Sequence, residues 1–158
     1  MKRCLALAVS AGALVLPSAS WAEGGGSGQV SVRAARVATS AAGCRTVDVA
    51  RVGRDIFGFV VYKFHQVKRW CWRYPRITSV SVSTYVSDVD PNMEYRGIFG
   101  SVSNYYRWCC GSGRSGHYSL RQGKFENCIL WFPCTRTEYP WVKIRAHGNG
   151  SYTYATGI

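Results

Sequence analysis

The most regular pattern in the chain lies between Thr78 and Val86, where β-branched residues occupy every second position and serine or tyrosine occupies the positions between them. Successive side chains of a strand point to opposite faces, so this period of two predicts a strand with one buried and one solvated face. Asp88–Asn92 follows, and its Pro91 and polar neighbours are typical of a turn. The sequence therefore predicts a strand that ends in a turn.

The segment before this strand is also rich in aromatic and β-branched residues, but its large side chains change parity. Phe57 and Phe59 occupy odd positions, whereas Trp70 and Trp72 occupy even positions. A single regular strand keeps its buried residues on one parity. We therefore expect either a bulge or two strands joined near His65.

Shorter segments bounded by glycine or proline predict the remaining strands. They are Met93–Phe99, Val102–Cys110, His117–Phe125, Trp141–His147 and Ser151–Thr156. The last two flank a glycine-rich turn at residues 148–150 and predict a hairpin. After the N-terminal region, no window keeps a helical period over three turns without glycine, proline or a β-branched run. The pattern predicts an all-β fold, an antiparallel sandwich or barrel of about seven to eight strands.

The N-terminal segment has the order of charge and hydrophobicity found in signal peptides. Lys2 and Arg3 precede the apolar stretch Leu5–Leu16, and Ser20 and Ala22 supply the small residues of a cleavage site. The apolar stretch is shorter than the roughly 20 residues that a transmembrane helix needs. We therefore predict a signal peptide over the first 22 residues and a secreted or extracytoplasmic mature protein.

The rest of the chain divides into a leader and one domain. Residues 23–43 are rich in glycine, serine and alanine, a composition that favours a flexible segment. Residues 44–158 are long enough for a single β domain with its own core. No segment of this domain has the length and hydrophobicity of a membrane span.

The cysteines predict disulfide bonds, since an even number follows the predicted signal peptide of an exported protein. They are Cys44, Cys71, Cys109, Cys110, Cys128 and Cys134. Neighbours on a strand face opposite ways, so we expect Cys109 and Cys110 to pair with different partners, with a bridge between them as the alternative. Cys128 and Cys134 either bridge each other or pair separately. No Cys-x-x-Cys pair occurs, so we expect no metal site.

Charge and aromatic residues suggest what the domain binds. The chain has 20 basic and 8 acidic residues and a net charge of +12, which favours anionic partners. Basic and aromatic residues are interleaved in Lys68–Arg76, Tyr105–Cys110 and Tyr139–Arg145. The candidate binding residues are Lys68, Arg69, Trp70, Trp72, Arg73, Tyr74, Arg76, Arg107 and Trp141. The competing and favoured interpretation places the tryptophans in the core and the arginines in water.

Motifs for catalysis are weak. The segment Gly113–His117 has histidine where a nucleophile elbow needs its second glycine, and no pair of carboxylates is singled out by its context. Asp88–Asn92 lacks the glycine and the closing glutamate of a calcium loop. No phosphate-binding loop, haem motif or dinucleotide fingerprint occurs. We therefore expect no cofactor and name no catalytic residue.

These features favour a secreted, non-enzymatic β domain that binds an anionic or glycan component of a cell envelope. We do not expect nucleic acid as the partner. The alternatives are a small secreted hydrolase whose site is assembled from distant residues, and a secreted inhibitor or toxin-like effector. A pocket lined by two carboxylates or by His with Ser would favour the enzyme, and a flat aromatic and arginine surface would favour binding.

Overall fold

The computed structural model describes residues 33–34, 41–109, 111, 113–128 and 134–158. The predicted signal peptide and most of the predicted flexible leader lie outside these residues. No helix that could cross a membrane occurs in the described part of the chain.

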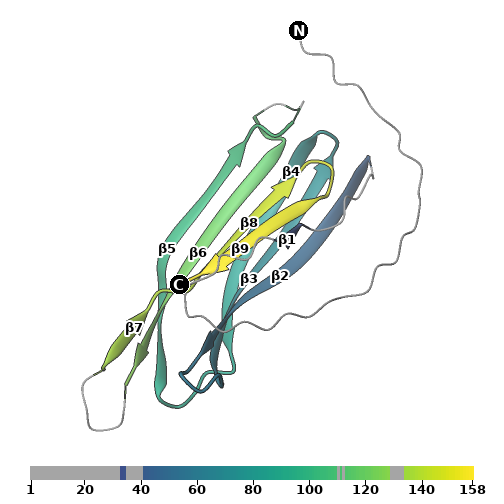
Figure 1. Cartoon of the computed structure of the whole chain (residues 1–158). Coiled ribbons are helices and arrows are strands. Elements are labelled where there is room, and N and C mark those ends of the chain that lie inside the picture. Colours follow the sequence, from purple (N-terminus) through teal and green to yellow (C-terminus); the bar gives the residue numbers. More distant parts are fainter. Residues whose placement is uncertain (1–32, 35–40, 110, 112, 129–133) are drawn as a thin grey trace, which may run out of the picture.

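The described residues form nine strands in two antiparallel sheets (Figure 1). The strands are β1 (Arg33–Ala34), β2 (Ala42–Arg54), β3 (Val60–Arg73), β4 (Arg76–Ser87), β5 (Met93–Tyr106), β6 (Gly116–Asn127), β7 (Arg136–Glu138), β8 (Trp141–His147) and β9 (Tyr152–Gly157). One sheet has the order β2-β3-β4, and the other has the order β1-β9-β8-β6-β5 with β7 also paired to β6. The predicted all-β, antiparallel class is confirmed.

The inner strand of the three-stranded sheet, β3, is continuous through His65 and buries every second residue from Tyr62 to Trp72. Phe57 and Phe59 precede the strand in an exposed loop. The expected bulge or junction near His65 is therefore wrong. The change of parity arises because the two loop phenylalanines do not belong to the alternating pattern of the strand.

The core lies between the two sheets. Tyr62 and Phe64 of β3 pack against Phe125 of β6 and Ile144 of β8, and the rings of Tyr62 and Phe125 stack with centroids 4.0 Å apart. A side chain at Gly53 would begin 2.3 Å from the Tyr62 ring, so this ring requires glycine beside it. These contacts hold the two layers face to face.

A second apolar cluster contains Trp70, Trp72, Ile77 and Ala146. Trp70 and Trp72 are buried, as the core interpretation of the tryptophans predicted. Two polar residues of β3, Gln66 and Lys68, are buried between this cluster and the first one along the strand. The interior is therefore apolar at both ends of β3 and polar in its middle.

The polar middle is hydrogen-bonded across the two sheets. The amino group of Lys68 donates to the carbonyl oxygens of His117 on β6, at 2.8 Å, and Ile144 on β8, at 3.0 Å. The amide of Gln66 donates to the hydroxyl of Ser119 on β6. Burial, together with the nearby positive charge of Arg121, lowers the pKa of Lys68 to about 7.

Elsewhere the strand predictions hold with one correction. The predicted strand at residues 78–86 lies within β4, and β8 and β9 form the predicted hairpin. The two strands expected at Met93–Phe99 and Val102–Cys110 are one strand, β5, so that division is wrong. The register of β5 is irregular between Tyr95 and Gly100, around Gly97 at a φ of 98°. A left-handed glycine lets the strand bend without ending.

Two disulfides are present in the described residues. Cys44–Cys71 joins opposite positions of β2 and β3, and Cys128–Cys134 closes the connection between β6 and β7. These bridges pair four of the six cysteines with one another. Neither Cys109 nor Cys110 is therefore bonded to one of those four, and the expectation that each pairs with a different one of them is wrong. Cys110 lies outside the described residues.

Trp72→Ala should lower the free energy of unfolding by about 3–5 kcal/mol, because it removes a buried ring and leaves a cavity. Chemical denaturation measures this change. Phe57→Ala is the matched control, since Phe57 is 78% exposed and its loss should change stability by less than about 0.5 kcal/mol. Equal stability of the Trp72→Ala variant and the wild type would contradict the burial of this ring.

From the lowered pKa of Lys68 we predict that the free energy of unfolding rises with pH above neutrality. The pKa of Lys68 is about 7 in the folded protein, against about 10.4 in an unfolded chain. Between these values the unfolded state binds a proton that the folded state lacks, so raising the pH favours folding by at most about 1.4 kcal/mol per unit.

Urea denaturation at several pH values from 7 to 9 tests this expectation, and Lys68→Met should flatten the slope. Lys63→Met is the control, because Lys63 is partly exposed and paired with Asp88. An unchanged slope in the Lys68→Met variant would show that another group causes the pH dependence.

Candidate functional site

A groove of about 720 Å³ lies on the outer face of the six-stranded sheet. Val142 and Ile144 of β8 point into the core, so Lys143 and Arg145 between and beside them point outward. The groove is lined by Tyr106, Trp108, Tyr118, Leu120, Lys143, Arg145, His147 and Thr153. It is thus built from β5, β6, β8 and β9 and the segment that follows β5.

Aromatic rings form one part of the groove. The ring of Trp108 stacks on that of His147 with centroids 4.4 Å apart and planes 10° apart, and Tyr106 meets His147 edge to face. The backbone of Trp108 is held by Ser115, whose hydroxyl accepts the Trp108 N–H at 2.7 Å and donates to the Trp108 carbonyl at 2.9 Å. A side chain at Gly116 would begin 2.5 Å from the Tyr106 ring, so this ring lies across the glycine. The rings are therefore fixed in place.

The charged groups of the groove are basic. Lys143 and Arg145 line it, and none of its lining residues is acidic. Burial lowers the pKa of His147 to about 4, and the positive charges of Lys68 and Arg145 contribute in the same direction. At neutral pH the imidazole is therefore uncharged and serves as a support for the Trp108 ring, and the positive charge comes from Lys143 and Arg145.

Two of the three interleaved aromatic and basic segments meet in this groove. Tyr105–Cys110 supplies Tyr106 and Trp108, and Tyr139–Arg145 supplies Lys143 and Arg145. Strand β6 lies between them in the sheet and pairs with both β5 and β8. The sequence showed the interleaving, and only the strand order brings these two segments together.

The third segment, Lys68–Arg76, is divided between the core and the surface. Lys68, Trp70 and Trp72 are buried and cannot reach a ligand, whereas Arg69 is exposed on the outer face of the three-stranded sheet. Trp141 is half-buried on the same sheet face as the groove, and its ring lies against Gly157.

The remaining predicted residues gather at the end of the domain that contains the β3–β4 turn. Arg73, Tyr74 and Arg76 line a smaller hollow of about 400 Å³ together with Arg114. Arg107 is exposed and donates from Nε to the carbonyl of Gly111, which lies against the same turn. We call these four arginines the arginine end.

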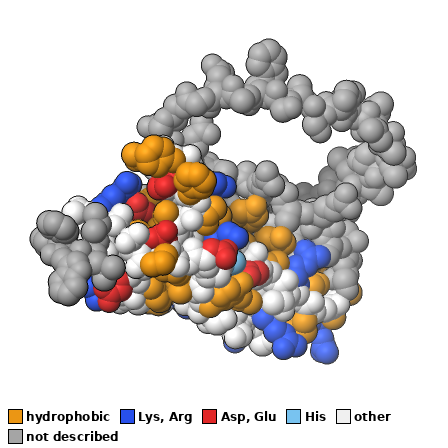
Figure 2. Space-filling view, turned by 90° about the horizontal axis from the view of Figure 1, so that it is seen from below, with side chains coloured by type: hydrophobic (Ala, Val, Ile, Leu, Met, Phe, Trp, Pro, Cys, Tyr) orange, Lys and Arg blue, Asp and Glu red, His pale blue; other side chains and the backbone are white. Residues whose placement is uncertain are grey.

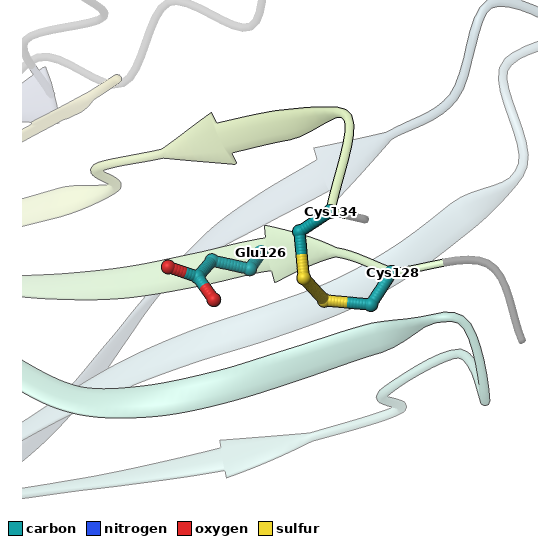
Figure 3. Close-up of side chains that lie close together, drawn as sticks. All are labelled: Glu126, Cys128 and Cys134. Carbon is teal, nitrogen blue, oxygen red and sulfur yellow. A yellow bond between two sulfur atoms is a disulfide. The ribbon is translucent and has the colours of Figure 1, made fainter. Parts of the chain in front are cut away.

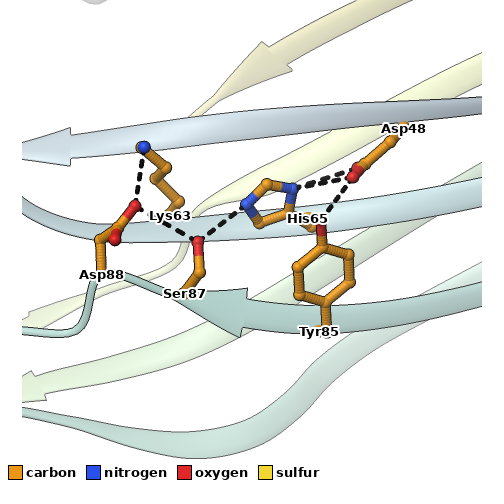
Figure 4. A network of polar contacts seen from close by, with 6 residues as sticks. All are labelled: Asp48, Lys63, His65, Tyr85, Ser87 and Asp88. Carbon is orange, nitrogen blue, oxygen red and sulfur yellow. Dashed lines mark hydrogen bonds and ion pairs between the residues drawn. The ribbon is translucent and has the colours of Figure 1, made fainter.

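A different polar array lies on the outer face of the three-stranded sheet (Figure 4). Nδ1 of His65 lies 3.1 Å from Oδ1 of Asp48, and Nε2 of His65 lies 3.1 Å from the hydroxyl of Ser87. Tyr85 stacks on His65 and donates its hydroxyl to Asp48. Its residues come from all three strands of the sheet and lie far apart in the sequence. They form no sequence motif, and only the pairing of the strands brings them together.

Glu126, Cys128 and Cys134 also lie close together, with ligand-type atoms within 4.8 Å of one another (Figure 3). Both sulfur atoms belong to one disulfide. The Glu126 carboxylate forms ion pairs with Arg96 and Lys124, which lower its pKa. The three groups are therefore already engaged within the protein and do not form a metal site.

Comparisons with protein-family models, with curated protein sequences and with solved structures gave no match.

Proposed function

We propose that this protein is a secreted binding domain that holds an anionic glycan of a cell envelope in the groove on the six-stranded sheet. The observation that carries the proposal is the lining of the groove, where aromatic rings lie beside Lys143 and Arg145 without an acidic residue. Binding sites of this kind combine flat apolar surfaces with a few polar groups that fix orientation. The net charge of the chain adds attraction over a longer range.

Different side chains of the groove would contact different parts of the glycan. Trp108 and Tyr118 offer flat apolar surface to a sugar ring, and Arg145 can form two parallel hydrogen bonds with a carboxylate or sulfate. Lys143 adds a compact charge beside it. Because the Trp108 backbone is already fixed by Ser115, binding costs less conformational entropy at this ring.

The double variant Lys143→Gln/Arg145→Gln should bind an anionic polysaccharide such as polygalacturonate about tenfold or more weakly than the wild type, since charged hydrogen bonds contribute about 1.5–3 kcal/mol each. Isothermal titration measures the affinity, and neutral dextran provides the uncharged comparison. The double variant Arg69→Gln/Arg73→Gln is the control with the same loss of charge outside the groove. An equal loss in both variants would assign the binding to net charge and contradict the site.

A second candidate function is acyl hydrolysis at Ser87, favoured by the hydrogen-bonded array of Asp48, His65 and Ser87. In such an array the Ser87 oxygen attacks the acyl carbon, His65 takes the hydroxyl proton and returns it to the leaving group, and Asp48 orients the imidazole. Water, deprotonated by His65, then attacks the acyl carbon, and the Ser87 oxygen leaves and regains its proton from His65. The array comes second because Asp48 and Tyr85 are exposed on the face of a sheet, where water is not excluded from a substrate.

A fluorophosphonate probe distinguishes this candidate. If His65 activates Ser87, intact mass and peptide mapping will show one adduct on Ser87 that is absent from the His65→Ala variant. Ser83→Ala is the control, since Ser83 lies on the same face of β4 opposite Val67 of β3 and should leave labelling unchanged. An unlabelled wild-type Ser87 would reduce the array to a structural network.

A further inference from the structure

The loop between β2 and β3 carries three large apolar side chains in water. Ile56, Phe57 and Phe59 are 87%, 78% and 71% exposed, and we call these residues the apolar tip. Figure 2 views the domain from this end and shows protruding apolar side chains next to acidic and basic groups. Apolar groups gathered on a protruding loop mark a surface that is covered by a partner.

The apolar tip is held in one conformation by its own backbone. The Asp55 carboxylate accepts the N–H groups of Phe57, at 2.9 Å, and Phe59, at 2.8 Å. Arg54 donates to the carbonyl of Gly58, which has a φ of 89° that favours glycine. The long strands β2 and β3 support this loop at its base. The side chains are thus presented outward by a fixed turn, so a partner does not have to order the loop.

The charges around the apolar tip cancel to within one unit, in contrast to the rest of this basic protein. Lys63 pairs with Asp88 at 2.7 Å, and Arg136 pairs with Glu138 at 3.0 Å. A strongly anionic partner would gain little from such a surface. The balance instead fits a partner that is apolar or carries equal numbers of both charges.

A hollow of about 510 Å³ lies beside the apolar tip and has the same mixed character. Arg54 and Arg136 line it together with Asp55, Asp90 and Glu138, and Phe57 contributes an aromatic wall. Guanidinium groups bind phosphate, and carboxylates with an aromatic face bind a quaternary ammonium group. Both groups occur in one zwitterionic phospholipid headgroup.

We propose that the apolar tip docks this protein on a zwitterionic phospholipid bilayer. Ile56, Phe57 and Phe59 enter the interfacial region, and the hollow beside them receives a phosphocholine headgroup. Aromatic and aliphatic side chains of peripheral proteins are buried to about 5–10 Å in this region. The membrane site lies on the β2–β3 loop and does not depend on the glycan groove, which is built from strands of the other sheet.

Sedimentation with phosphatidylcholine vesicles tests the proposal. The wild type should bind, and Ile56→Ser/Phe57→Ser should bind at least tenfold more weakly with an unchanged melting temperature. Phe99→Ser is the matched control, since Phe99 is 63% exposed on β5 and should leave vesicle binding intact. Because the contact is apolar, binding should persist from 0.1 to 1 M salt, over which the Debye length falls from about 10 to about 3 Å. Soluble glycerophosphocholine should compete for the hollow.

Several outcomes would overturn the membrane proposal. They are no binding of the wild type to phosphatidylcholine vesicles, equal binding of the apolar-tip variant, and binding confined to anionic vesicles and lost in salt. Capture of a protein partner through the apolar tip without vesicle binding would also overturn it. The groove variant Lys143→Gln/Arg145→Gln should bind vesicles normally, so failure of the glycan proposal and failure of the membrane proposal can be told apart.

Discussion

The hydrogen bonds of one buried amino group set how the two sheets face each other. Lys68 extends from β3 across the interior and donates to backbone carbonyls on two neighbouring strands of the opposite sheet. An amino group in this position would be costly without those acceptors, so few other relative positions of the sheets would be tolerated. Gln66 repeats the arrangement one step along β3 through Ser119. The apolar clusters on either side then pack in the register that these polar contacts allow.

The sequence predicted most of the architecture where side chains alternate simply. The alternation at residues 78–86 and the glycine turn at 148–150 identified a strand and a hairpin that the structure confirms. The prediction from alternation failed before β3. Phe57 and Phe59 lie in the preceding loop and do not belong to the alternating pattern of the strand. Burial of Lys68 could not be read from its type, since lysine is rarely fully buried.

The candidate sites were likewise only partly predictable, because the sequence pattern shows residue types and strand pairing decides which of them meet. Interleaved aromatic and basic residues were visible in three segments. Two of them share a groove because both of their strands pair with β6, while the third alternates between the core and the surface along β3. Asp48, His65 and Ser87 come from three strands and meet only through strand pairing. The composition identified the residue types involved. It could not show which individual residues of each type lie together on the same exposed surface.

The length of β3 keeps the two ends of the domain electrically separate. Its fourteen residues run from the apolar tip to the arginine end, and at about 3.3 Å per residue they span about 45 Å. This distance is several times the Debye length of about 8 Å at physiological ionic strength. A phosphate or proton bound at one end therefore leaves the potential at the other unchanged. The charges of the arginine end therefore have little influence on what approaches the apolar tip.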